Sequence, residues 1–73
     1  MKEKIEKEME KSKRKIKWLI KYVRLCVKDM QGYMKEDDFA NAKVEVEDAI
    51  DVLVWICEEL EVLSRLKELL KND

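Results

Sequence analysis

The segment GYMKEDDF, residues 32–39, divides the chain into two arms of similar length and decides the fold. It contains the only glycine, Gly32, and a run of three acids at positions 36–38, in a chain without proline. The Asp38 side chain is placed to accept a backbone N–H hydrogen bond at the start of a helix beginning at Phe39. A connection this short between two helices makes them antiparallel. We therefore predict one tight turn between two long helices.

The arm before the turn carries a heptad pattern. Its apolar residues recur at alternating spacings of four and three, the pattern of a helix that packs along a second helix. With Ser12 filling one position, these residues are Ile5, Met9, Ile16, Leu19, Val23, Cys26, Met30 and Tyr33. The pattern predicts a helix over residues 2–34 with one apolar seam.

The arm after the turn repeats the pattern and predicts a helix over residues 38–71. Its expected seam, with Lys67 as the one polar member, consists of Phe39, Ala42, Val46, Ala49, Leu53, Ile56, Leu60, Leu63 and Leu70. The expected fold class is thus all-α: a single domain of residues 1–73, built as an antiparallel two-helix hairpin that pairs into a four-helix bundle. An alternative breaks the first arm near residues 11–13 and folds residues 2–10 back as a third helix.

Composition limits the class of protein. Charged residues make up 45% of the chain and hydrophobic residues 47%, which is typical of amphipathic helices and too apolar for a disordered polyelectrolyte. The longest apolar stretch, residues 49–57, is interrupted by Asp51 and is far shorter than the roughly 20 residues of a membrane span. The first residues do not resemble a secretory signal. We expect a cytoplasmic protein without a membrane span.

Charge is divided unequally between the arms. Residues 1–28 carry eleven cations and four acids, whereas residues 29–73 carry five cations and thirteen acids. With a turn near residues 36 and 37, two residues lie level across the hairpin when their numbers sum to about 73, and this places Lys15 of the segment KSKRKIK opposite Glu59. Opposite charges favour the antiparallel pairing, although each exposed pair contributes only about 0.2–1 kcal/mol.

A second interpretation of the basic arm is binding to a polyanion. Five cations recur at helical spacing along its outer face, with Trp18 and Tyr22 nearby: Arg14, Lys17, Lys21, Arg24 and Lys28. Such a stripe suits a nucleic acid or an anionic membrane surface. The net charge of −1 argues against this as the principal function, and we keep it as the alternative.

Apolar residues outside the seam form two further strips. One flank combines Ile20, Val27 and Met34 with Ile50 and Cys57, and the other combines Trp18, Tyr22 and Leu25 with Val52, Trp55, Val62, Leu66 and Leu69. A two-helix hairpin has one internal seam and cannot cover both strips. We therefore expect an interaction or scaffold module that self-associates, with a dimer as the first guess. The remaining flank is left for another copy or a protein partner.

The sequence offers little for catalysis. It has no histidine, no glycine-rich phosphate loop and no paired-cysteine motif. The acids at positions 36–38 and at Glu58, Glu59 and Glu61 fit solvated helix faces better than a metal site. Cys26 and Cys57 are expected to be buried, inert thiols. We predict no enzymatic activity, no cofactor and no metal.

The turn and its flanks carry a recognisable pattern. It consists of Asp29 and Tyr33 before the turn, Asp38 and Phe39 at it, and Ala42, Ala49 and Leu53 after it. This pattern resembles the archaeal helical-hairpin proteins grouped as domain of unknown function 357, over roughly residues 16–56. The sequence departs from that family at Asp37, where glycine is usual, at Asp48, where tyrosine is usual, and at Val54, where aspartate is usual. The resemblance implies the same hairpin fold and no assigned activity.

Overall fold

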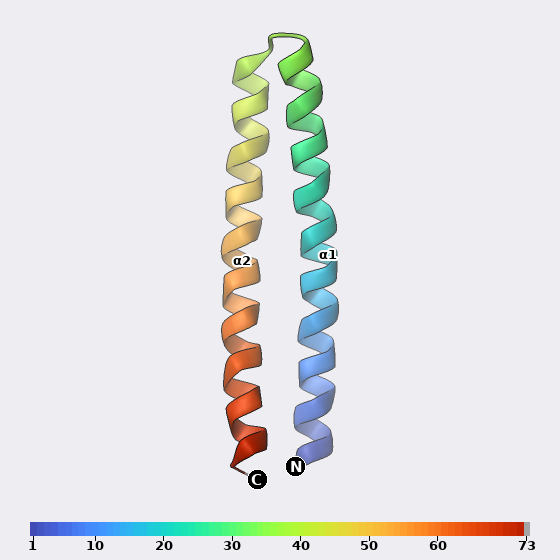
Figure 1. Cartoon of the computed structure of the whole chain (residues 1–73), viewed down its shortest axis with the longest axis vertical. Coiled ribbons are helices and arrows are strands. Elements are labelled where there is room, and N and C mark those ends of the chain that lie inside the picture. Colours follow the sequence, from blue (N-terminus) through green and yellow to red (C-terminus); the bar gives the residue numbers. More distant parts are fainter. Residues whose placement is uncertain (73) are drawn as a thin grey trace.

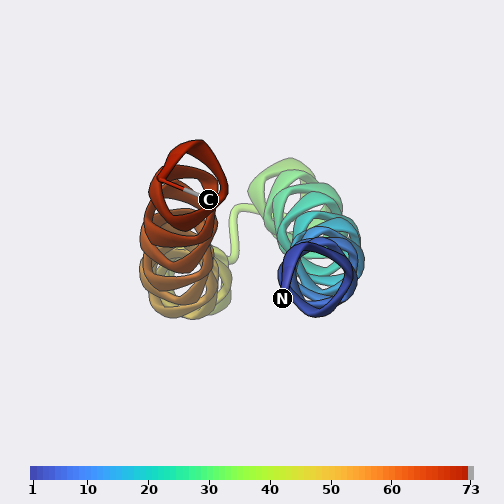
Figure 2. The same cartoon turned by 90° about the horizontal axis from the view of Figure 1, so that it is seen from below.

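Two helices make up the computed structural model, which describes residues 1–72. Helix α1 spans Lys2–Lys35 and helix α2 spans Phe39–Lys71. They lie side by side and antiparallel along their whole length, with both termini at one end and the turn at the other (Figures 1 and 2). The rod measures 55 × 14 × 11 Å. The predicted all-helical hairpin is confirmed, with α1 ending one residue later and α2 beginning one residue later than expected.

Helix α1 runs without interruption from Lys2 to Lys35 (Figure 1). Residues 2–10 therefore continue α1 instead of folding back, and the alternative of a third helix is wrong. Within residues 1–72, neither helix combines the length and apolar character needed to cross a bilayer.

The turn is closed by hydrogen bonds at both helix ends. The Asp38 N–H donates to the Tyr33 carbonyl at 2.9 Å and the Asp37 N–H donates to the Met34 carbonyl at 3.2 Å, which together form a Schellman motif. Asp38 Oδ1 accepts the Asn41 backbone N–H at 3.3 Å, so the predicted N-cap of α2 is confirmed.

The left-handed residue of the turn is Asp37, with φ of 55°. Glycine is favoured in this conformation because it has no Cβ. The only glycine, Gly32, lies instead inside α1, and a Cβ added there meets nothing within 4 Å.

The seam of α1 agrees with the predicted heptad, but the seam of α2 is rotated. The two patterns share Ala42, Ala49, Ile56, Leu63 and Leu70, which are buried or half-buried. The remaining inward positions are Glu45, Val52, Glu59 and Leu66, in place of the expected Val46, Leu53, Leu60 and Lys67. Phe39, Val46, Leu53 and Leu60 are exposed, so their assignment to the seam was wrong.

The rotation follows from polar matching across the seam. Ser12 is buried, and its single hydroxyl hydrogen is shared between two acceptors, the Glu59 backbone carbonyl at 3.4 Å and Glu59 Oε2 at 3.5 Å. The small side chain of Cys26 is buried near Glu45. Buried polar groups need partners, so the two small α1 residues favour the two glutamates opposite them.

Two substitutions test this description of the turn: one introduces glycine at Asp37, which has the left-handed conformation, and the other removes glycine from position 32, which is helical. Asp37→Gly removes the Cβ penalty of the left-handed conformation and should raise the free energy of unfolding by about 0.5–1 kcal/mol. Gly32→Ala should also stabilise by about 0.5–1 kcal/mol, because it restores helix propensity without a clash. Urea unfolding at one fixed protein concentration measures both. A loss of stability in Asp37→Gly would contradict the assigned turn geometry.

Candidate interaction surfaces

The hairpin leaves much of its apolar surface in water. Across residues 1–72 only Ser12, Cys26, Ala42, Ala49 and Val52 are buried, and the accessible surface is 6144 Å². A compact monomer of 8.8 kDa is expected to expose about 4,800 Å². The excess of roughly 1,300 Å² is comparable to the surface buried in a standard protein–protein interface.

The larger apolar surface lies on one flank of the rod, and we call it the aliphatic face. In α1, each residue of this face comes directly after a seam residue in the sequence. In α2, Val46, Leu53 and Leu60 likewise come directly after seam residues. Equivalent positions of two antiparallel helices fall on the same flank. The exposed apolar residues of the aliphatic face are Ile20, Val27 and Met34 from α1, with Phe39, Val46, Ile50, Leu53, Cys57 and Leu60 from α2.

On α2 the aliphatic face has a heptad repeat of its own. Positions 46, 50, 53, 57 and 60 follow one another at spacings of four and three, and all are exposed and apolar. This is the spacing that packs against a further helix. Helix α2 thus carries two adjacent heptad seams and α1 covers only one of them.

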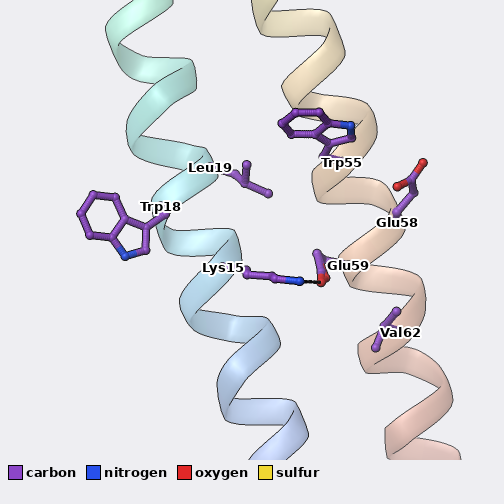
Figure 3. A pocket seen from close by; sticks show the side chains of 7 residues that line it. All are labelled: Lys15, Trp18, Leu19, Trp55, Glu58, Glu59 and Val62. Atoms are coloured by element: carbon purple, nitrogen blue, oxygen red, sulfur yellow. Dashed lines mark hydrogen bonds and ion pairs between the residues drawn. The ribbon is translucent and has the colours of Figure 1, made fainter.

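The opposite flank, the aromatic face, consists of Trp18, Tyr22 and Leu25 from α1 and Trp55, Val62 and Leu69 from α2. Two adjoining hollows of about 480 and 470 Å³ open on it, and Trp18, Leu19 and Trp55 line both. Trp18 points away from α2, whereas Leu19 points towards it, so the two indoles border the groove without stacking (Figure 3). The groove is apolar at its floor and open to solvent.

Two residues predicted for the aromatic strip lie elsewhere. Val52 is only 6% exposed and belongs to the seam between the helices, and Leu66 is half-buried there. The rotation of the α2 seam moves them inward. The same rotation adds Phe39, Val46 and Leu53 to the exposed surface, together with Leu60, although the heptad pattern had placed these four residues in the core.

A charged pair lies at the groove of the aromatic face. Lys15 reaches across the groove, and its Nζ lies 3.5 Å from Glu59 Oε1, which confirms the predicted cross-hairpin pair (Figure 3). Because the Lys15 side chain is 62% exposed, the pair contributes less than about 1 kcal/mol. The pair helps to fix the register of the two helices, because Glu59 also accepts a hydrogen bond from the Ser12 hydroxyl.

The five cations of the predicted polyanion stripe all lie on the exposed surface of α1. Lys21 Nζ sits 5.0 Å from the centroid of the Trp18 ring, within range of a cation–π interaction. Within residues 1–72, none of the five forms an ion pair; the pairs are Lys13–Glu10, Lys15–Glu59 and Lys71–Glu68. The stripe is therefore a solvated cationic surface.

The two cysteines differ in environment. Cys26 is buried, as predicted, whereas Cys57 is exposed, so the prediction of burial was wrong for Cys57. Burial raises the pKa of the Cys26 thiol, and the nearby Glu45 and Asp48 carboxylates raise this pKa further. The pKa of the Tyr22 phenol is raised chiefly by charge on Cys26 and then by the Asp48 carboxylate.

Within residues 1–72, no three residues of types His, Cys, Asp or Glu gather in a way that would hold a metal ion. The two faces offer apolar contact, and the Lys15–Glu59 pair lies at the aromatic groove. No protein-family model, curated protein or solved structure matches this chain.

The raised pKa of Cys26 predicts the direction of a pH dependence. A thiol that holds its proton more tightly when folded stabilises the protein fully below the unfolded pKa, near 8.5, and this stability is lost as the pH rises towards the folded pKa. Unfolding free energy should therefore fall as the pH rises above about 8.5, by at most about 1.4 kcal/mol per pH unit.

Denaturant unfolding at each pH measures this slope, and one cysteine variant locates its source. Cys26→Ala should flatten the slope, whatever its effect on absolute stability. An equal slope in Cys26→Ala and the unmodified chain would assign the dependence to another group.

Proposed function

We propose that this chain is a non-catalytic helical interaction module that self-associates through its aliphatic face, with a dimer forming a four-helix bundle. The observation that carries the proposal is the second heptad seam of α2, in which Val46, Ile50, Leu53 and Leu60 are between 42% and 53% exposed. A seam of this kind in water is typical of a helix that has a further partner.

The size of the exposed surface supports the same proposal. A dimer that removes about 800 Å² from each copy has a standard-size interface. The excess exposure of each hairpin, estimated above at roughly 1,300 Å², is large enough to supply this area. The aliphatic strip runs across both helices, so a second hairpin lying along it covers both arms at once.

The aromatic face stays open in such a dimer, and we assign it to a protein partner of the assembly. Its groove combines an apolar floor with tryptophan and tyrosine, residue types that are enriched where proteins bind one another. The two free cysteines favour a reducing compartment, which supports placing the module in the cytoplasm. The hairpin fold itself agrees with the resemblance to domain of unknown function 357, and membership of that family remains a proposal.

A matched pair of neighbouring substitutions tests self-association. Leu53→Glu places a carboxylate in the proposed interface and should weaken the dimer by about 2 kcal/mol in each copy, or roughly a thousandfold in Kd. Val54→Glu adds the same charge at a similarly exposed residue, 51% against 47%, that points outward from the face. This control should leave Kd within a few-fold of the unmodified value. Sedimentation velocity over a concentration series measures both.

Equal effects of these two variants would reject the aliphatic face as the interface. Trp55→Glu then tests the opposite flank: dissociation by Trp55→Glu and not by Leu53→Glu would move the interface to the aromatic face. Circular dichroism at each concentration shows that the helices persist in every variant.

The second candidate function is binding of a polyanion by the outer surface of α1. The observation that favours it is the stripe Arg14, Lys17, Lys21, Arg24 and Lys28, whose charges have no acidic partner within residues 1–72. Replacing the first four of these with glutamine should weaken binding to single-stranded RNA or anionic vesicles. The unmodified chain should lose affinity steeply as salt rises. Binding that is insensitive to both changes would eliminate this candidate.

A further inference from the structure

The distribution of charge along the rod is segregated by helix. Residues 11–28 of α1 contain eight cations and no acid, and residues 44–64 of α2 contain seven acids and no cation. The contacts of Glu59 with Ser12 and Lys15 set the register and place these two segments level with one another. The middle of each hairpin is therefore cationic along one helix and anionic along the other.

This segregation distinguishes the ways in which two hairpins can pair. Because the aliphatic face extends over both helices, a second copy that covers it must lie face to face with the first. Two alignments of the rods are then available under two-fold symmetry. With turns at opposite ends, α1 lies over α1 and α2 over α2 of the second copy. With turns at the same end, α1 of each copy lies over α2 of the other.

Only one alignment brings opposite charges together. With the rods fully overlapped, turns at opposite ends stack the cationic segment on its own copy and the anionic segment on its own copy, which is unfavourable. Turns at the same end place each cationic segment between two anionic ones. Residues 11–28 of one copy then lie level with residues 44–64 of the other.

The same alignment also matches the apolar surface without a shift. A two-fold axis parallel to the rod keeps every residue at its own height, so the aliphatic strip of one copy meets the whole strip of the other. On α2 the strip runs from Leu60 to the turn at Phe39, and no member of the strip lies nearer the open end of the rod. In the opposed alignment, the rods must slide along one another to superimpose these strips, and this slide shortens the overlap of the rods and brings no oppositely charged segments together.

We propose that the hairpin dimerises face to face with both turns at the same end, α1 of each copy packing against α2 of the other. This inference rests on the proposed self-association and specifies its geometry. The occupant of the aliphatic face is a second copy of the chain, selected by the complementary charge of the two helices.

Spin-label distances between the two copies test the arrangement. A single label at Lys4→Cys, in a Cys57→Ser background with Cys26 buried, reports on the open end of the rod. A label at Gly32→Cys, where a side chain meets open space, reports on the turn end. Interhelical spacings of about 8–10 Å place both label pairs within about 35 Å in the proposed dimer. Opposed turns separate the Lys4 labels by about 50 Å or more, at 1.5 Å per residue along each helix.

Light scattering on each labelled sample separates the possible failures. A dimer with Lys4 labels about 50 Å or more apart overturns the same-end geometry and leaves self-association standing. A monomer for the unmodified chain overturns both. If the Lys4 label alone dissociates the dimer, the exposed Lys7→Cys position gives the same comparison.

The salt dependence of Kd gives an independent readout. Attraction between opposite charges is screened by salt, so raising NaCl from about 20 to about 300 mM should weaken the same-end dimer several-fold. Like charges in contact would produce the reverse, and a dimer that tightens over this range would contradict the proposal.

Discussion

Two helices packed side by side can each cover only one stripe of the other, and this constraint governs the whole molecule. The seam between α1 and α2 buries five side chains, and none of them is larger than valine. Stability must therefore come from a long, shallow contact closed at one end by the turn. Every apolar residue beyond that stripe remains in water, and the surfaces on both flanks are a direct consequence of the fold.

Polar residues in the seam explain why the exposed surface is so large on one side. Glu59 is held by Ser12 and Lys15, and Glu45 lies beside Cys26. These contacts rotate α2 so that Val46, Leu53 and Leu60 face outward, alongside Ile20, Val27 and Met34 of α1. A hairpin optimised as a monomer would bury the leucines and expose the glutamates. The observed choice suits a helix that has to satisfy two neighbours.

Much of the fold was predictable because its signals are local. The acidic turn, the Asp38 cap, the heptad of α1 and the Lys15–Glu59 pair all follow from short-range spacing and from one register rule. The seam of α2 was not predicted, because two heptads share Ala42 and Ala49 and hydrophobicity alone favours the wrong one. The sequence does contain a signal for the observed seam: Ser12 and Cys26 are separated by the same number of residues as Glu45 and Glu59, so both pairs can meet across the hairpin. Recognising it requires the pairing of both helices, which no single-helix pattern contains.

The solution mass of the unmodified chain tests the central claim most directly. Multi-angle light scattering over a concentration series at low and moderate salt gives this mass without labels or substitutions. Self-association through the aliphatic face predicts a mass that approaches twice the 8.8 kDa of one chain as concentration rises. A mass that stays at 8.8 kDa at the highest concentration and lowest salt would contradict it. The exposed second seam of α2 would then be the binding surface for a different protein.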